Sequence, residues 1–152
     1  MYEELKSLLR QMSLEYFASG VHRCDIEEFK KDLLNGEDIT IIDVRTKEEY
    51  RIVSFNFMRN IPLHELPDRY KEIPVDKKVL LFCSCKVRIL IAYVFLKVMG
   101  FDKVKILDVD YEKNKVEIVY KGKNKTYKAW VDFSKLMSEE EWMHVEMWST
   151  KK

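Results

Sequence analysis

Three short apolar runs stand out along the chain, and each is rich in Val, Ile and Leu. They occupy residues 39–44, 79–83 and 104–107. Runs of this length and composition are typical of strands that are buried on both faces of a parallel sheet. Two shorter strands are predicted near residues 21–23 and 59–62. The pattern therefore indicates a sheet whose strands are distributed over most of the chain.

Helical periodicity fills the intervals between these runs. Apolar residues recur at every third or fourth position over residues 2–18, which predicts one helix there. Residues 89–99 are apolar on almost every side, which predicts a second, deeply buried helix. Capping boxes, in which a polar side chain and a Glu three residues later bond the first turn of a helix, begin at Asp25 and Thr46. Strands that alternate with helices in this way predict an α/β domain with a parallel sheet.

Beyond Leu107 the pattern changes. Residues 115–120 and 126–133 alternate apolar and polar positions, which predicts a hairpin with one face in water. A last helix is predicted to start at Ser138 and to include Trp148. Because a lone hairpin is only marginally stable, we expect hairpin and helix to pack on the α/β domain, beside its reactive loop. The predicted organisation is an N-terminal helix at 1–20, the α/β domain at 21–107 and this extension at 108–152.

The composition indicates one globular domain. The chain has 152 residues, 47% of them apolar and 35% charged, and a net charge of +1 from 27 basic and 26 acidic residues. This balance provides no general attraction to nucleic acid or to anionic membranes. The longest uncharged apolar run, residues 89–96, is too short to span a bilayer, and the first residues lack the pattern of a signal peptide. We therefore expect a cytoplasmic protein with no nucleic-acid or membrane partner.

Cysteine chemistry is concentrated at one strand end. The chain has three cysteines, an odd number that argues against a disulfide framework, and Cys83 and Cys85 lie one residue apart where a predicted strand ends. Ligands of α/β proteins bind at the carboxyl ends of strands. There the N–H groups of a tight turn, the N-terminus of the next helix, and the cations Lys86 and Arg88 favour a thiolate. We therefore expect Cys83 to be a reactive nucleophile with a pKa below that of a free thiol; a small buried side chain that only packs is the alternative.

Several motifs appear in a characteristic order around this loop. An Asp-Val-Arg-x-x-x-Glu-Tyr segment follows a predicted strand at Asp43–Tyr50, and an Asn-Ile-Pro segment follows at Asn60–Pro62. A six-residue loop runs from a Cys to an Arg at Cys83–Arg88, and the next helix closes on Gly-Phe before a strand at Gly100–Val104. In this order and spacing, the motifs resemble the rhodanese-like domain, the single-domain sulfurtransferase family, over about residues 21–107.

The resemblance implies a three-layer α/β/α fold with a mainly parallel five-stranded sheet, to which the C-terminal hairpin and helix would be added. It implies that Cys83 carries sulfane sulfur as a persulfide, and that Asp43 and Arg45 are structural residues near the site. The implied partners are a small sulfur donor and a thiol or cyanide acceptor, with no cofactor and no metal. The residues of the implied substrate-binding loop are Ser84, Cys85, Lys86, Val87 and Arg88.

The chain also departs from the family pattern at the rim of the site. The Gly and His residues usual after Glu-Tyr are absent from Val53–Met58, and Lys86 stands where the loop usually has Gly. Asp108–Asp110 replaces the Gly-Gly that usually follows the last strand. A left-handed backbone at Lys86 would cost on the order of 1–2 kcal/mol, so the loop is expected to differ in shape or to be strained. These departures leave an alternative function open, a non-catalytic rhodanese-like module that binds a protein partner through its altered rim and its C-terminal extension.

Other interpretations concern the remaining ligand-type side chains. Cys85 either resolves a persulfide on Cys83 or simply replaces a usual Ser. A zinc site of His22, Cys24, Cys83 and Cys85 is disfavoured, because the Cys-x-Cys spacing is tighter than in zinc knuckles and the strands bearing Cys24 and Cys83 are not neighbours in the resembled fold. A phosphatase is also disfavoured, because a loop that wraps phosphate needs one more residue before its Arg.

Overall fold

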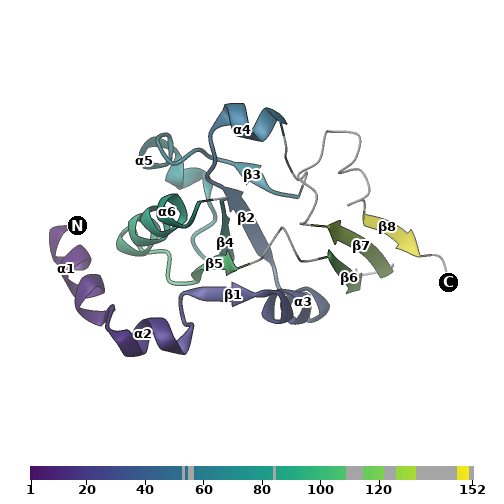
Figure 1. Ribbon diagram of the computed structural model, residues 1–152, viewed down its shortest axis with the longest axis horizontal. Coiled ribbons are helices and arrows are strands. Elements are labelled where there is room, and N and C mark those ends of the chain that lie inside the picture. The colour runs from purple at the N-terminus through teal and green to yellow at the C-terminus, as the bar shows by residue number, and fades with distance from the viewer. Residues whose placement is uncertain are drawn as a thin grey trace.

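A five-stranded parallel sheet lies at the centre of the fold (Figure 1). The computed structural model describes residues 1–52, 54, 57–83, 85–108, 115–121, 126–132 and 147–150. The order of the sheet is β1-β5-β4-β2-β3, and all neighbouring strands are parallel, as the sequence predicts. Its strands are β1 (Arg23–Asp25), β2 (Ile39–Asp43), β3 (Arg59–Asn60), β4 (Lys78–Phe82) and β5 (Val104–Asp108). Because parallel strands share one direction, all of them end at the same edge, which we call the carboxyl edge.

Helices precede the sheet and connect its strands. They are α1 (Tyr2–Gln11), α2 (Leu14–Ser19), α3 (Ile26–Leu34), α4 (Lys47–Ile52), α5 (Leu66–Arg69), a 3-10 turn η1 (Tyr70–Glu72) and α6 (Lys86–Val98). Of the helices that the structure describes, none is long and apolar enough to cross a membrane.

The alternating side chains of β4 separate two hydrophobic cores. Leu80 packs with Phe29 of α3 on one face, and Leu81 packs with Ala92 and Leu96 of α6 on the other. All of these side chains are buried. Helices thus cover both faces of the sheet, with α3 and α6 on opposite sides (Figure 1). This is the three-layer arrangement that the sequence predicts.

The N-terminal segment differs from its prediction. A single helix was expected over residues 2–18, but α1 ends at Gln11 and α2 begins at Leu14. The break is set by Ser13, whose hydroxyl accepts a bond from the Tyr16 N–H group and caps α2. The break turns α2 away from α1, which packs against α6 (Figure 1).

The C-terminal segment forms a second, antiparallel sheet. The predicted hairpin is present as β6 (Lys115–Lys121) and β7 (Thr126–Asp132), and β8 (Met147–Thr150) adds a third strand beside β7. The helix predicted from Ser138 therefore does not reach Trp148, because Trp148 pairs with Lys128 in this sheet. The beginning of that predicted helix lies outside the described residues.

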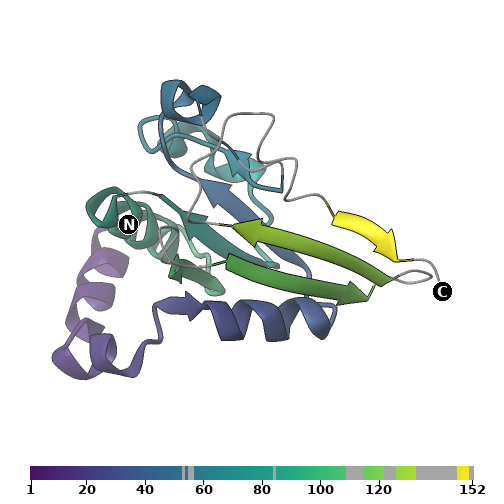
Figure 2. The same ribbon diagram turned by 45° about the vertical axis from the view of Figure 1, so that its right-hand side comes forward.

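Strand β6 of the hairpin runs along α3 (Figure 2), and packing of the whole extension on the α/β domain stays a prediction. We also expected it to lie beside the loop that follows β4. Residues 109–114 and 133–146, which connect the hairpin to β5 and to β8, lie outside the described residues. Proximity to that loop stays a prediction.

A buried ion pair stands at the carboxyl edge, where β2 ends. Asp43 is 0% exposed and Arg45 is 4% exposed. The Arg45 guanidinium donates to the Asp43 carboxylate, with Nη2 2.7 Å from Oδ2 and Nε 3.1 Å from both oxygens. The Arg45 backbone N–H group adds a bond of 2.9 Å to Oδ1. Each charge is thus neutralised inside the protein.

The same pair connects three strand ends. The Asn60 side chain donates to the backbone oxygens of Asp43, at 3.0 Å, and of Arg45, at 2.8 Å, which joins the end of β3 to β2. The Arg45 guanidinium lies 5.4 Å from the centre of the Phe82 ring, in a cation–π contact with the last residue of β4. Because Phe82 directly precedes Cys83, this contact also positions the start of the following loop.

The buried pair should contribute far more to stability than an exposed one. Replacing Asp43 by Asn leaves the Arg45 cation buried without its counter-charge, so Asp43→Asn should lower the free energy of unfolding by on the order of 3 kcal/mol. Asp108→Asn is the matched control, because it removes a half-exposed carboxylate that lies 3.0 Å from Arg23; it should cost less than about 1 kcal/mol. Urea unfolding measures both, and equal losses would contradict the structural role of Asp43.

Candidate active site

The candidate site is the loop between β4 and α6. Cys83 follows the last residue of β4 at the carboxyl edge, and α6 begins at Lys86. The loop is therefore shorter than expected, because Lys86 belongs to the first turn of the helix. No non-glycine residue in the described part of the chain has a positive φ angle, so Lys86 does not carry left-handed strain. Of the two alternatives left open by the missing Gly, left-handed strain at Lys86 is excluded, and a different loop shape stays a prediction.

Cys83 is half-buried beneath this turn. Its Sγ atom lies 3.4 Å from the Cys85 backbone nitrogen, whose N–H group donates to it. Burial raises the pKa of the Cys83 thiol, and the lowering effects of the Cys85 N–H group and the Arg88 charge are smaller. The expectation of a lowered pKa is therefore wrong for Cys83. The charges that we identified in the sequence are present, but removal of the thiolate from water outweighs them.

Cys85 lies in a different environment two residues later. It is the N-cap residue of α6, with extended φ and ψ angles of −121° and 123°. Its side chain makes no capping hydrogen bond. The N–H groups of Arg88 and Val87 nevertheless lower the pKa of the Cys85 thiol, and the Arg88 side chain adds to the effect. The first turn of α6 therefore favours the thiolate at Cys85 rather than at Cys83.

Arg88 points to a carboxylate from another helix. Its Nη1 and Nη2 atoms lie 2.6 and 3.1 Å from the two oxygens of Glu49, which makes a bidentate ion pair between α6 and α4. Glu49 also accepts bonds from the Thr46 N–H and hydroxyl groups, at 3.2 and 3.0 Å. The Arg88 bonds lower the pKa of Glu49 to about 2, against a smaller opposing effect of burial. The positive charge of Arg88 thus acts on the loop and also on the Glu49 carboxylate, which Thr46 holds in place.

The sequence interpretation did not assign Glu49 to the site. The available signal was the capping box from Thr46 to Glu49, which turns this carboxylate back toward the start of α4 at the carboxyl edge. Of the implied loop residues, Lys86 and Val87 are exposed on the first turn of α6, and Ser84 lies outside the described residues. Leu90 and Ile91 extend the exposed apolar surface of α6 beyond Val87.

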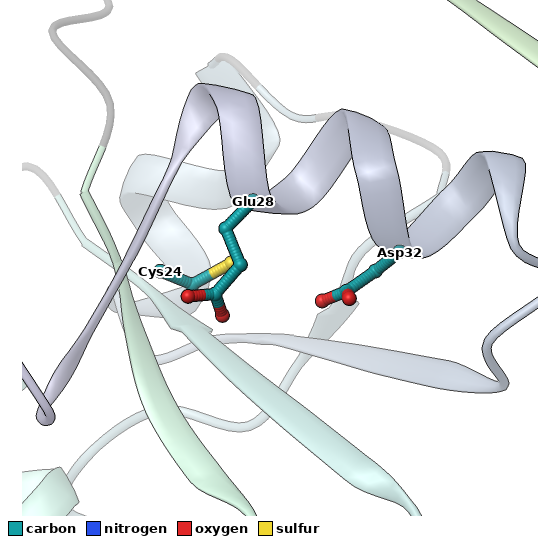
Figure 3. A group of neighbouring side chains, drawn as sticks. All are labelled: Cys24, Glu28 and Asp32. Carbon is teal, nitrogen blue, oxygen red and sulfur yellow. The ribbon is translucent and has the colours of Figure 1, made fainter.

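A separate cluster holds the third cysteine, on the face of the sheet that α3 covers. The Cys24 sulfur and the carboxylates of Glu28 and Asp32 lie within 4.8 Å of one another and point to the same side of α3 (Figure 3). Lys78 donates to both carboxylates, and Lys105 donates to Glu28 at 3.0 Å. These ammonium groups already supply the positive charge, so the cluster fits a metal ion poorly.

The surroundings of this cluster shift the pKa values of Cys24 and Glu28 in opposite directions. Burial raises the pKa of Cys24 to about 12, so this thiol is neutral. Burial would also raise the pKa of Glu28, but the bonds from Lys78 and Lys105 lower it to about 2. Because β5 separates β1 from β4, Cys24 lies on a strand that does not neighbour the one that ends at Cys83, as expected.

Comparisons with known proteins agree with this fold. The family model of the rhodanese-like domain matches residues 25–117. A protein named sulfurtransferase from Allochromatium vinosum is 30% identical over 84 residues, which are 55% of this chain and 78% of that protein. The putative sulfur carrier protein YrkF from Bacillus subtilis is 31% identical over 87 residues, which are 57% of this chain and 47% of that protein.

Solved structures show the same similarity in three dimensions. Reduced Bacillus anthracis CoADR-RHD has a TM-score of 0.51 and 33% identity, over 62% of this chain and 16% of that chain. A rhodanese-related protein from Thermoplasma volcanium has a TM-score of 0.50 and 24% identity, over 57% of this chain and 83% of that chain. The second similarity supports the fold alone.

The three thiols should differ in reactivity toward iodoacetamide. We expect Cys85 to be alkylated first, because N–H groups at the start of α6 lower its pKa. Burial should slow Cys83, and Cys24 should react last. Mass spectrometry of tryptic peptides over a range of pH measures the rates, and fragmentation of the peptide that contains both Cys83 and Cys85 assigns the label to one or the other. A pH midpoint for Cys83 below the midpoint for Cys85 would contradict this order.

The bond between Glu49 and Arg88 should make stability depend on pH. The pKa of Glu49 is about 2 in the folded protein, below the value of the unfolded chain, so the bond contributes fully above about pH 5 and is lost as the pH falls toward 2. The stability difference between wild type and Glu49→Gln should therefore shrink as the pH is lowered. Urea unfolding measures it, and Glu48→Gln, at an exposed neighbouring position, is the control. A difference that is constant with pH would refute the assignment.

Proposed function

Because the chain belongs to the rhodanese-like domain family, we propose that it is a sulfurtransferase that carries sulfane sulfur as a persulfide on Cys83. The relatives named sulfurtransferase and putative sulfur carrier, at about 30% identity, support sulfur transfer in general. The observation that carries the assignment to Cys83 is its place at the carboxyl edge, with a backbone N–H group donating to its sulfur. The Arg88 charge also acts on this sulfur and favours its thiolate.

The proposed reaction has two steps. In the first, the Cys83 thiolate attacks the sulfane sulfur of a donor such as thiosulfate. A bond forms between Cys83 Sγ and that sulfur, and sulfite leaves with the electron pair of the broken S–S bond. In the second, a thiol or cyanide acceptor attacks the outer sulfur, and the Cys83 thiolate leaves. The Cys85 N–H group and the Arg88 charge favour the anionic forms of Cys83 in both steps.

The charge around the loop bears on which donors are accepted. A dianionic donor meets Lys86, Arg88 and the start of α6, but it also meets the Glu49 carboxylate that holds Arg88. We therefore propose the thiosulfate:cyanide reaction as the assay reaction, in which sulfur loading and sulfur release are measured separately. A persulfide donor of lower charge would be less sensitive to Glu49.

A non-catalytic binding module is the second candidate function. Two observations favour it. The Arg88 charge is engaged by Glu49, and the outer surface of α6 next to the loop exposes Val87, Leu90 and Ile91. In that case, α6 would contact a protein partner and Cys83 would take up no sulfur. Sulfur loading therefore separates the two candidates.

Substitution of Cys83 should abolish sulfur loading without unfolding the protein. Incubation of Cys85→Ser, in which Cys83 is the one thiol left in the loop, with thiosulfate should add about 32 Da, the mass of one sulfur atom, and cyanide should reverse the gain. Cys83→Ser should show no gain and no turnover, because its hydroxyl cannot form a persulfide. Intact-protein mass spectrometry measures loading, and circular dichroism verifies the fold. Undiminished loading or turnover in folded Cys83→Ser would overturn the proposal.

A further inference from the structure

The loop contains a second thiol that sulfur transfer by Cys83 alone does not require. We propose that Cys85 is a resolving thiol, which attacks the Cys83 persulfide and releases its outer sulfur as hydrosulfide. This inference rests on the proposed function, because it needs the Cys83 persulfide as its substrate. It adds a second outcome for the bound sulfur, namely reduction to sulfide instead of transfer to an external acceptor.

The loop brings the two cysteines close together. The Cys85 N–H group donates to Cys83 Sγ at 3.4 Å, so the chain folds back over the sulfur within two residues. Two residues of extended chain span at most about 7 Å. A disulfide needs Cα atoms no farther apart than about 7 Å, and a folded-back chain lies within this limit. Both cysteines are partly exposed, and both are free thiols.

The two thiols differ in how readily they ionise. Cys85 lies at the N-cap of α6, where the N–H groups of Arg88 and Val87 and the Arg88 guanidinium favour its thiolate. Cys83 is half-buried, and burial disfavours its thiolate. The thiolate form is the nucleophile in exchange between thiols and S–S bonds. The loop therefore pairs an attacking sulfur at Cys85 with a sulfur that is attacked at Cys83.

The persulfide offers two sulfur atoms to the Cys85 thiolate. Attack on the outer sulfur would expel the Cys83 thiolate and move the sulfane sulfur to Cys85, which releases no sulfide. Attack on Cys83 Sγ expels the outer sulfur as hydrosulfide. Cys83 Sγ is the sulfur that the loop holds against the Cys85 backbone, so the geometry favours attack at this atom.

The step is balanced. The Cys85 thiolate forms a bond with Cys83 Sγ, and the bond between Cys83 Sγ and the outer sulfur breaks. The outer sulfur takes up one proton from water and leaves as HS⁻ with both electrons of that bond. Sulfane sulfur gains two electrons, and the two cysteines lose two electrons as they form a disulfide. A small thiol or a dithiol protein must then reduce this disulfide before the next cycle.

The test follows one peptide through a single turnover. Trypsin cleavage after Lys78 and Lys86 releases residues 79–86, which contain Cys83 and Cys85 and no other cysteine. Reduced protein, freed of reductant, is incubated without air with thiosulfate, or with inorganic polysulfide as a second donor, and is then alkylated. The wild type should release one hydrosulfide per chain and yield peptide 79–86 as an internal disulfide. Cys85→Ser should release none and yield the peptide with one additional sulfur atom.

Matched variants make the outcome decisive. Cys24→Ala changes the cysteine outside the loop and should behave as the wild type, and Cys85→Ala replaces Cys85→Ser if the latter fails to fold. If the wild type keeps its additional sulfur to the same extent as Cys85→Ser, the resolving role is refuted while the sulfurtransferase function stands. If no protein, including Cys85→Ser, takes up sulfur from either donor, the proposed function itself fails. Wild type kept without donor must stay reduced, which excludes oxidation by residual air.

Discussion

The buried ion pair between Asp43 and Arg45 is the interaction on which the carboxyl edge depends. Two charges removed from water are tolerable only because each satisfies the other, and because the backbone and Asn60 bond the atoms around them. The pair joins the ends of β2 and β3, and its guanidinium lies on the Phe82 ring at the end of β4. The loop that carries Cys83 therefore starts from a rigid base, and its own few residues do not have to set its position.

From this base, one loop creates two unlike thiols. Cys83 extends the strand and is half-buried, whereas Cys85 stands at the start of α6, where N–H groups point out of the helix. The same short turn therefore removes one sulfur from water and brings the other to a site that favours negative charge. Arg88 influences both thiols, and Glu49 moderates its charge from α4. The chemistry of the loop thus depends on the two elements that flank it and on α4, which is distant in sequence.

Much of the fold can be predicted from the sequence, because burial on both faces of a strand leaves a clear pattern. The apolar runs at 39–44, 79–83 and 104–107 correspond to β2, β4 and β5. The break between α1 and α2 was missed, because apolar periodicity continues across Ser13 and only its capping bond reveals the interruption. The strand at Trp148 was missed because it forms against β7, a partner that helical spacing does not reveal.

The candidate site was predictable in its residues but not in its electrostatics. The motif order indicated Cys83, Arg88, Asp43 and Arg45, and the structure brings them to one edge of the sheet; the catalytic role of Cys83 stays a prediction. The predicted direction of the Cys83 pKa shift was wrong, because the burial of the sulfur depends on packing by segments that are distant in sequence. The partner of Arg88 was missed for the same reason, since Glu49 lies in another helix.

The order of the strands also has a consequence for the chain as it is synthesised. β1 carries Cys24 near the N-terminus, but its neighbour in the sheet is β5, where Cys24 lies opposite Leu107. During synthesis, β1 leaves the ribosome first, and it can pair only after β5, the last strand of the parallel sheet, has also emerged. Until then, the Cys24 sulfur is in water and open to oxidants. The thiol that is best protected in the finished protein is thus the one that stays exposed longest during its synthesis.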